Sequence, residues 1–243
     1  MEYNMKNLNK LSIFSLMSVI LLSSCETTEL DLTVNPNALS PENASADLFI
    51  NGIQEDFAYF VDDLGSVGSR LTRIRYMGGA RLYNDTYSPS SFSGTWTNAY
   101  QGMLEDIRLM NILAEEAGLT YYVGMGQVMQ AYIAMTLVDY FGDVPYSEAL
   151  QGSDNLNPAA DSGESVYNAA LSLLDAAIAN FNQGGAAPQY DMYYGGNASK
   201  WIKAANSIKK RAHLNMGDYA AYSAITDYIT DNADDFQFQW GTN

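Results

Sequence analysis

The chain has little of what most catalytic and metal-binding sites use. Its 243 residues include one cysteine and one histidine, Cys25 and His213. A single cysteine excludes an internal disulfide and any multi-cysteine metal site, and a single histidine excludes a histidine cluster around a metal. No nucleophile elbow or phosphate-binding glycine loop is present. We therefore expect neither an enzyme nor a bound cofactor, although the many carboxylates leave a glycosidase pair open.

Basic residues are also scarce. Lysine and arginine number 12 against 28 acidic residues, which gives a net charge of −16. Such an excess argues against nucleic acid or anionic lipid as a general partner. The run Lys209-Lys210-Arg211 lies near the end of an expected helix, where positive charge favours the helix dipole. A basic patch that faces a partner is the alternative for this run.

No apolar run is long enough to span a membrane, which takes about 20 residues. The uncharged run 11–22 follows Lys6 and Lys10 and leads into Leu22-Ser23-Ser24-Cys25. A basic start, a short apolar stretch and small residues before a cleavage point are typical of a secretory signal. The last four residues resemble the lipobox of bacterial lipoproteins. That resemblance implies that residues 1–24 are removed, and that lipid on Cys25 ties the mature protein to a membrane.

The remaining sequence predicts a tether and one helical domain. Residues 25–39 are acidic and are expected to form a solvated linker, and the domain is expected over residues 40–243. Ser40-Pro41-Glu42 combines an N-cap, a first-turn proline and an acid, which predicts a helix start. An apolar stripe follows at three- and four-residue spacing. Its members are Leu48, Phe49, Ile53, Phe57, Phe60, Val61 and Leu64.

Five more helices are predicted, and they place the protein in the all-α class. Asp161 and Glu164 are expected to form a capping box at the third of them. The five ranges are 95–117, 121–141, 161–183, 198–214 and 218–229. Their lengths indicate antiparallel pairs like those of tetratricopeptide repeats. The only alternating pattern, residues 236–240, indicates a little strand near the C-terminus.

The segment 78–95 is too long for a simple connection and is the predicted ligand site. Sugar binding needs flat aromatic rings and planar polar side chains. Both kinds are present among Arg81, Tyr83, Asn84, Asp85, Tyr87 and the adjacent Trp96. An ordinary surface loop would contain the same residue types. Trp96 and Trp201 lie on helical stripes, which favours core positions for both.

Several segments together resemble the SusD/RagB family of outer-membrane lipoproteins, and most of all its second branch. The most specific is Phe-Gly-Asp-Val-Pro-Tyr-Ser-Glu-Ala at residues 141–149. The others are the Cys25 lipobox, residues 35–37, Trp96 with Tyr100, residues 131–132 and residues 194–209. The resemblance implies a tetratricopeptide-like helical fold and a cell-surface protein. It also implies capture of an oligosaccharide or peptide over a SusC-like, TonB-dependent transporter in the outer membrane.

Length departs from the family, whose members are usually about twice as long. The resemblance therefore implies an N-terminal half or fragment, in which part of the ligand surface is missing. Two alternatives stay open: a tetratricopeptide-type scaffold that binds protein but no glycan, and a surface glycoside hydrolase.

The segment at residues 141–145 has a purely structural interpretation, which we prefer. Gly142 can end the preceding helix in a left-handed cap, and Pro145 prevents the helix from restarting. Asp143 can accept backbone hydrogen bonds in the turn.

Overall fold

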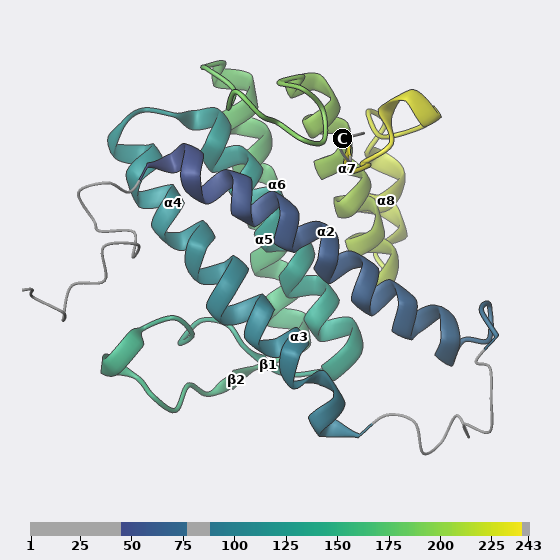
Figure 1. Cartoon of the computed structure of the whole chain (residues 1–243). Helices are drawn as coiled ribbons and strands as arrows, with labels where there is room; N and C mark the ends of the chain where they lie inside the picture. Colours follow the sequence, from purple (N-terminus) through teal and green to yellow (C-terminus); the bar gives the residue numbers. More distant parts are fainter. Residues whose placement is uncertain (1–44, 77–87, 240–243) are drawn as a thin grey trace, which may run out of the picture. The chain divides into compact units, whose positions relative to one another are not determined.

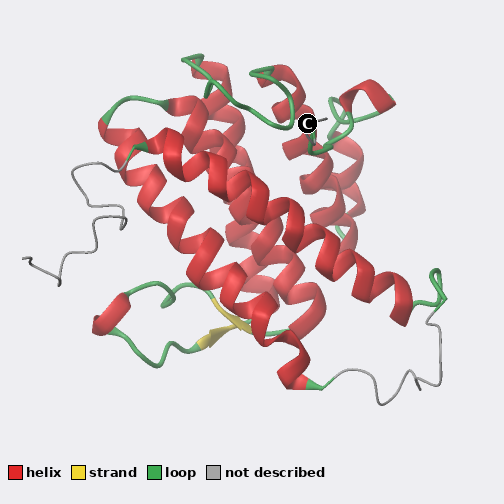
Figure 2. Ribbon diagram, viewed as in Figure 1, coloured by secondary structure: helices red, strands yellow, loops and turns green. Residues whose placement is uncertain are grey.

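A computed structural model describes residues 45–76 and 88–239 (Figure 1). These residues are mostly helical, and the all-α prediction is confirmed (Figure 2). The α-helices are α2 (Ala46–Leu71), α3 (Ser93–Thr97), α4 (Glu105–Glu116), α5 (Thr120–Phe141), α6 (Gly163–Gln183), α7 (Ala198–Asn215) and α8 (Tyr219–Ala224). Short 3₁₀ turns are η2 (Pro89–Phe92), η4 (Gly152–Asp154) and η5 (Asn232–Asp234).

Helix α2 buries one stripe against the domain. Ser45 is its N-cap and accepts a hydrogen bond from the Leu48 amide at 3.4 Å. The predicted start at residues 40–42 lies outside the described residues. Leu48 and Val61 were wrongly assigned to the stripe, since their exposed fractions are 51% and 36%. The buried face of α2 follows a spacing of three and four residues that includes neither Leu48 nor Val61. Its members are Ile50, Ile53, Phe57, Phe60 and Leu64.

The helix predicted over 95–117 changes its pitch along its length. It runs as α3, the π-helical segment η3 (Asn98–Leu104) and α4. A π-turn contains an extra residue and shifts the face that follows. In this segment Ala99, Met103 and Leu104 are buried.

Helix α5 is the centre of the domain and is buried on nearly every side, because apolar residues occur nearly all round it. It packs against α4 and α6, and α6 packs against α7. Gly124 allows the close approach to α6, because a Cβ there would lie 3.0 Å from the Phe181 ring. Among the helices that the structure describes, none combines the length and the hydropathy needed to cross a membrane.

The connection from α5 to α6 explains the segment at residues 141–149 in structural terms. Gly142 caps α5 at the predicted position, with φ +80° and ψ −123°, which is outside the left-handed helical region that we expected. Strand β1 (Val144–Pro145) pairs antiparallel with β2 (Ala160–Asp161). The Asp143 carboxylate accepts a hydrogen bond at 3.0 Å from the Gly163 amide, where α6 begins.

Asp161 belongs to the same connection, and the predicted capping box was wrong. Its carboxylate accepts hydrogen bonds from the amides of Tyr146 (3.0 Å) and Ser147 (2.8 Å). The N-cap of α6 is Ser162, whose hydroxyl accepts from the Ser165 amide at 3.3 Å. The partners of Asp161 lie on the other side of the two-stranded ladder, 14 and 15 positions earlier in the chain, so local spacing could not predict them.

The C-terminal elements are shorter than predicted. Helix α7 begins at Ala198, as expected, with Asn197 as its N-cap, but α8 ends at Ala224 rather than near Ile229. Residues 236–239 form no strand; one backbone hydrogen bond joins the Gln239 amide to the Met192 carbonyl at 2.8 Å. The alternation at these residues instead directs Phe236 and Phe238 towards the core.

The basic run at the end of α7 has intramolecular partners. Lys209 pairs with Asp175, and Arg211 pairs with Asp139 at 2.7 Å. The Lys210 ammonium donates to the Tyr222 carbonyl at 2.8 Å. The run therefore has a structural role, but through these partners rather than through the helix dipole, since the basic residue in the last turn of α7 is His213.

Candidate functional site

A cleft of about 1040 Å³ opens between α2, α5, α7 and the segment at residues 229–238, here called the strap. Aromatic rings form its apolar lining. They come from four parts of the chain: Phe57 on α2, Tyr132 on α5, Tyr193 before α7, and Phe236 and Phe238 on the strap.

The rings form one continuous cluster. The Phe57 ring meets the Tyr132 ring edge to face, with centroids 5.3 Å apart. The centroid of the Tyr193 ring lies 4.6 Å from that of Phe236 and 5.5 Å from that of Phe238. Phe57 and Tyr193 are buried, while Phe236 and Phe238 on the strap are only partly buried. A ligand in the cleft can therefore contact the two strap rings, which rest on the buried ones.

Polar side chains also line the cleft. Asp62, Arg75, Arg211, Asp235 and Gln237 are the longer ones, and Ser66, Ser69 and Ser207 contribute hydroxyls. A concave apolar surface with a few convergent polar groups is the usual build of a small-ligand site.

Arg211 is held in place by three helices. Its guanidinium donates to the Asp139 carboxylate and lies over the Tyr132 ring, 5.1 Å from the centroid. Asp139 in turn accepts from the Tyr167 hydroxyl, which receives a hydrogen bond from Asn215 at 2.9 Å. The network joins α5, α6 and α7, so the guanidinium enters the cleft in one preferred orientation.

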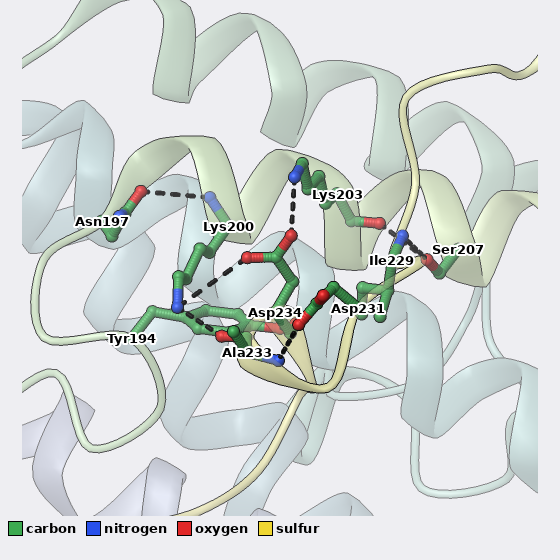
Figure 3. Close-up of polar contacts among 9 residues, drawn as sticks. All are labelled: Tyr194, Asn197, Lys200, Lys203, Ser207, Ile229, Asp231, Ala233 and Asp234. Atoms are coloured by element: carbon green, nitrogen blue, oxygen red, sulfur yellow. Dashed lines mark hydrogen bonds and ion pairs between the residues drawn. The ribbon is translucent and has the colours of Figure 1, made fainter.

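The strap is attached to α7 by a second polar network (Figure 3). The Asp234 carboxylate lies between two lysines, 2.6 Å from the Lys203 ammonium and 3.8 Å from that of Lys200. The hydrogen bond from Lys203 lowers the pKa of Asp234. At the start of the strap, the Ile229 amide donates to the Ser207 hydroxyl on α7 at 3.0 Å.

Beside the cleft lies a closed polar region, here called the Asp191 cluster (Gln54, Tyr121, Asp191 and Trp201). The Asp191 carboxylate accepts from the Trp201 indole (2.8 Å), the Tyr121 hydroxyl (3.2 Å) and the Gly196 amide (2.9 Å). Burial, followed by the nearby Asp191 charge, raises the pKa of Tyr121. This buried region is satisfied internally and serves the fold.

The Gln54 side chain completes the Asp191 cluster from α2. It accepts from the Met192 amide at 2.8 Å and donates to the Tyr190 carbonyl at 3.0 Å. Gln54 and Asp191 thereby fix the turn that carries Tyr193, and this turn supplies one wall of the cleft.

The predicted site residues fall in two groups. Cys25, Arg81, Tyr83, Asn84, Asp85 and Tyr87 lie outside the described residues, and their roles stay predictions. Trp96 is half-buried and stacks on Tyr100, with centroids 5.3 Å apart and planes within 8°. It also contacts Phe141 and does not line the cleft, in keeping with its expected core role. Trp201 is fully buried, as expected.

The sequence did not predict the cleft. One signal was available: the period-two spacing of Phe236 and Phe238 directs both rings to one side. Two of the rings that complete the lining, Phe57 on α2 and Tyr132 on α5, lie more than 100 positions earlier. Across residues 45–76 and 88–239, no group of three or more metal-ligating side chains is assembled.

Comparisons with known proteins agree with this architecture. The chain is similar over 79% of its length to a SusD/RagB family protein from Bacteroides thetaiotaomicron, with 25% identity and a TM-score of 0.66. It is similar over 82% of its length to a SusD homolog from Bacteroides fragilis, with 22% identity and a TM-score of 0.64. These matches cover 44% and 45% of the two structures, so the chain spans under half of their length.

None of the functionally curated proteins compared with the chain is similar enough to count as a match. One family model does match, over residues 37–243, and its description reads "Starch-binding associating with outer membrane". A match over nearly the whole domain, together with the shared fold, leads to one conclusion: the chain belongs to the SusD-like family, in its second branch.

Proposed function

We propose that this protein is a cell-surface lipoprotein that binds a nutrient glycan in the cleft and passes it to a SusC-like, TonB-dependent transporter. The observation that carries the proposal is the cleft itself, in which five aromatic rings lie beside planar polar side chains. Apolar faces of sugar rings pack on aromatic rings, and hydroxyl groups pair with the guanidinium, carboxylate and amide groups.

Binding without catalysis is the proposed activity. The family description names starch binding and association with the outer membrane, which supports a binding protein at that membrane. In the cleft, Asp62 and Asp235 are the two carboxylates. We assign both carboxylates to hydrogen bonding with sugar hydroxyl groups, which an ionised carboxylate can accept, and neither to proton transfer.

Anchoring and delivery are the finer parts of the proposal. Residues 1–24 would be the signal peptide, lipid on Cys25 would hold the protein to the outer membrane, and residues 25–39 would be the tether. Cys25→Ala should move the protein from the membrane fraction to the soluble fraction. Retention of this variant on membranes would contradict the lipid anchor.

Glycan binding and transporter binding need separate measurements. Calorimetry of residues 26–243 with neutral oligosaccharides should detect binding, while a reducing-end assay of the same mixture should detect no product. The full-length lipoprotein should co-purify with a barrel transporter from outer membranes. A tetratricopeptide-type scaffold would give protein co-purification but no heat of glycan binding, and a hydrolase would release reducing ends.

A further inference from the structure

The charged side chains of the cleft suggest which glycans it accepts. Arg75 and Arg211 supply positive charge, and Asp62 and Asp235 supply negative charge. Arg211 is already neutralised by Asp139 at 2.7 Å. Within residues 45–76 and 88–239, by contrast, Asp62 and Asp235 form no hydrogen bond through their side chains and no ion pair. Arg75 donates to the Ser66 hydroxyl at 3.2 Å and offsets one of these two carboxylates, so the cleft keeps an excess of one negative charge.

The rest of the molecule adds to that excess. The whole chain has a net charge of −16. Exposed charges interact over about 8–10 Å at moderate salt, which is comparable to the size of a cleft of this volume. A carboxylate or sulfate on a sugar would therefore meet Asp62 and Asp235 at short range and a repulsive field on approach.

The same two carboxylates suit the hydroxyl groups of an uncharged sugar. An ionised carboxylate accepts hydrogen bonds only, and each oxygen can take a hydroxyl donor. Arg211 supplies the complementary donors in an orientation fixed by Asp139 and Tyr132. Hydroxyl groups both donate and accept, so an uncharged polyol can satisfy both kinds of group at once.

We propose that the cleft selects uncharged oligosaccharides over acidic ones, with Asp62 and Asp235 as the selecting residues and Arg211 as the oriented donor. The inference rests on the proposed function, namely that the cleft holds a glycan. It goes further by naming the charge class of the ligand and the residues that determine it.

The test is a calorimetric panel with residues 26–243 at low salt. Neutral malto-, cello-, xylo- and manno-oligosaccharides are compared with oligogalacturonate, oligoalginate and a sulfated oligosaccharide of matched length. We expect the best neutral ligand to bind at least about tenfold more tightly than any acidic one. The ratio of neutral to acidic affinity should fall at high salt, because screening weakens the repulsion of the acidic ligands.

Variants assign the selectivity to residues. The double variant Asp62→Asn, Asp235→Asn should bring the acidic ligands to within about threefold of the neutral one, because the amides remove the repulsion. Arg211→Gln should weaken the neutral ligand about tenfold through the loss of a charge-assisted donor. There are two matched controls: Asp154→Asn on an exposed loop, and Lys209→Gln two residues before Arg211. Both should leave the affinity for the neutral ligand and the ratio of neutral to acidic affinity unchanged.

The outcomes separate the inference from the proposed function. If no glycan of either class binds, the proposed function fails. If an acidic glycan binds as tightly as the best neutral one, the function stands and the selectivity is overturned. An unchanged ratio in the Asp62, Asp235 double variant would overturn the assignment to these residues, and circular dichroism confirms that each variant is folded.

Discussion

The Asp191 cluster and the cleft lie side by side and share one wall, yet their polar groups are used in opposite ways. In the cluster, Asp191 accepts hydrogen bonds from an indole, a phenol and backbone amides, and Gln54 has partners on both its oxygen and its nitrogen. In the cleft, the carboxylates of Asp62 and Asp235 lie at the surface with no such partner among the described residues.

The difference separates stability from binding. A buried polar group must be satisfied within the protein, since each one left unpaired costs about 1–3 kcal/mol. A polar group at the edge of a cleft is satisfied by water and can exchange that water for a ligand. Changes in the Asp191 cluster should therefore lower the stability of the fold, and changes in the cleft should alter binding with little loss of stability.

The largest effect is expected from Asp191→Ala. Removal of the carboxylate leaves the Trp201 indole and several amides without an acceptor, which should lower the free energy of unfolding by about 3–5 kcal/mol. Urea denaturation followed by circular dichroism measures this loss. The control Asp154→Ala, on the exposed loop, should stay within about 0.5 kcal/mol of the parent. Equal stability of the two variants would break the distinction between the regions.

Gln54→Leu should have the next largest effect. Leucine fills similar space but leaves the Met192 amide and the Tyr190 carbonyl unpaired, at a cost of about 1–3 kcal/mol. Thermal and urea unfolding would both report the loss. Glu55→Leu, one position along α2 and exposed, is the matched control and should change stability little. If Gln54→Leu leaves the free energy of unfolding unchanged, the turn before α7 does not depend on this side chain.

Phe238→Ala tests the cleft side of the comparison. The ring is only half-buried, so its loss should cost about 1 kcal/mol of stability. Removal of a ring from the lining should nevertheless weaken glycan binding about tenfold, or 1.4 kcal/mol. Calorimetry with the best neutral oligosaccharide gives the affinity, and urea unfolding gives the stability. Unchanged affinity in a folded variant would remove Phe238 from the site.

The smallest effect concerns the attachment of the strap. The hydrogen bond from Lys203 lowers the pKa of Asp234 in the folded protein, so its contribution is present above the ordinary pKa of about 4. It is lost as the pH falls through the lowered value. Stability measured from pH 7 to about pH 3 should therefore fall less steeply in Asp234→Asn than in the parent. Parallel curves would contradict the role of this carboxylate, and Asp154→Asn should follow the parent.

Much of the fold could be predicted because its signals are local. Each correct prediction involved residues within a few positions of one another: the stripe on α2, the end of α5 at Gly142 and the start of α7 at Ala198. The errors have long-range causes. Asp161 caps nothing because it reaches across the ladder to Tyr146 and Ser147. Residues 236–239 form no strand because a strand needs a paired neighbour, and among the described residues a single backbone hydrogen bond, from Gln239 to Met192, joins them to another segment.

The site was harder to predict than the fold. The sequence drew attention to residues 81–87, where aromatic and polar residues are adjacent in the chain. The cleft instead collects Phe57, Tyr132, Arg211 and Phe236, which lie on four separate segments. No local pattern marks such an assembly, because each residue taken alone looks like part of a helix stripe or a surface.

The most direct test of the central claim is to locate a bound glycan on the protein. Hydroxyl-radical footprinting of residues 26–243, with and without the tightest neutral oligosaccharide, measures which side chains become protected. The account predicts protection of Tyr132, Phe236 and Phe238, and none of the exposed Tyr219. Protection confined to Tyr83 and Tyr87, with the cleft rings labelled equally in both samples, would contradict it.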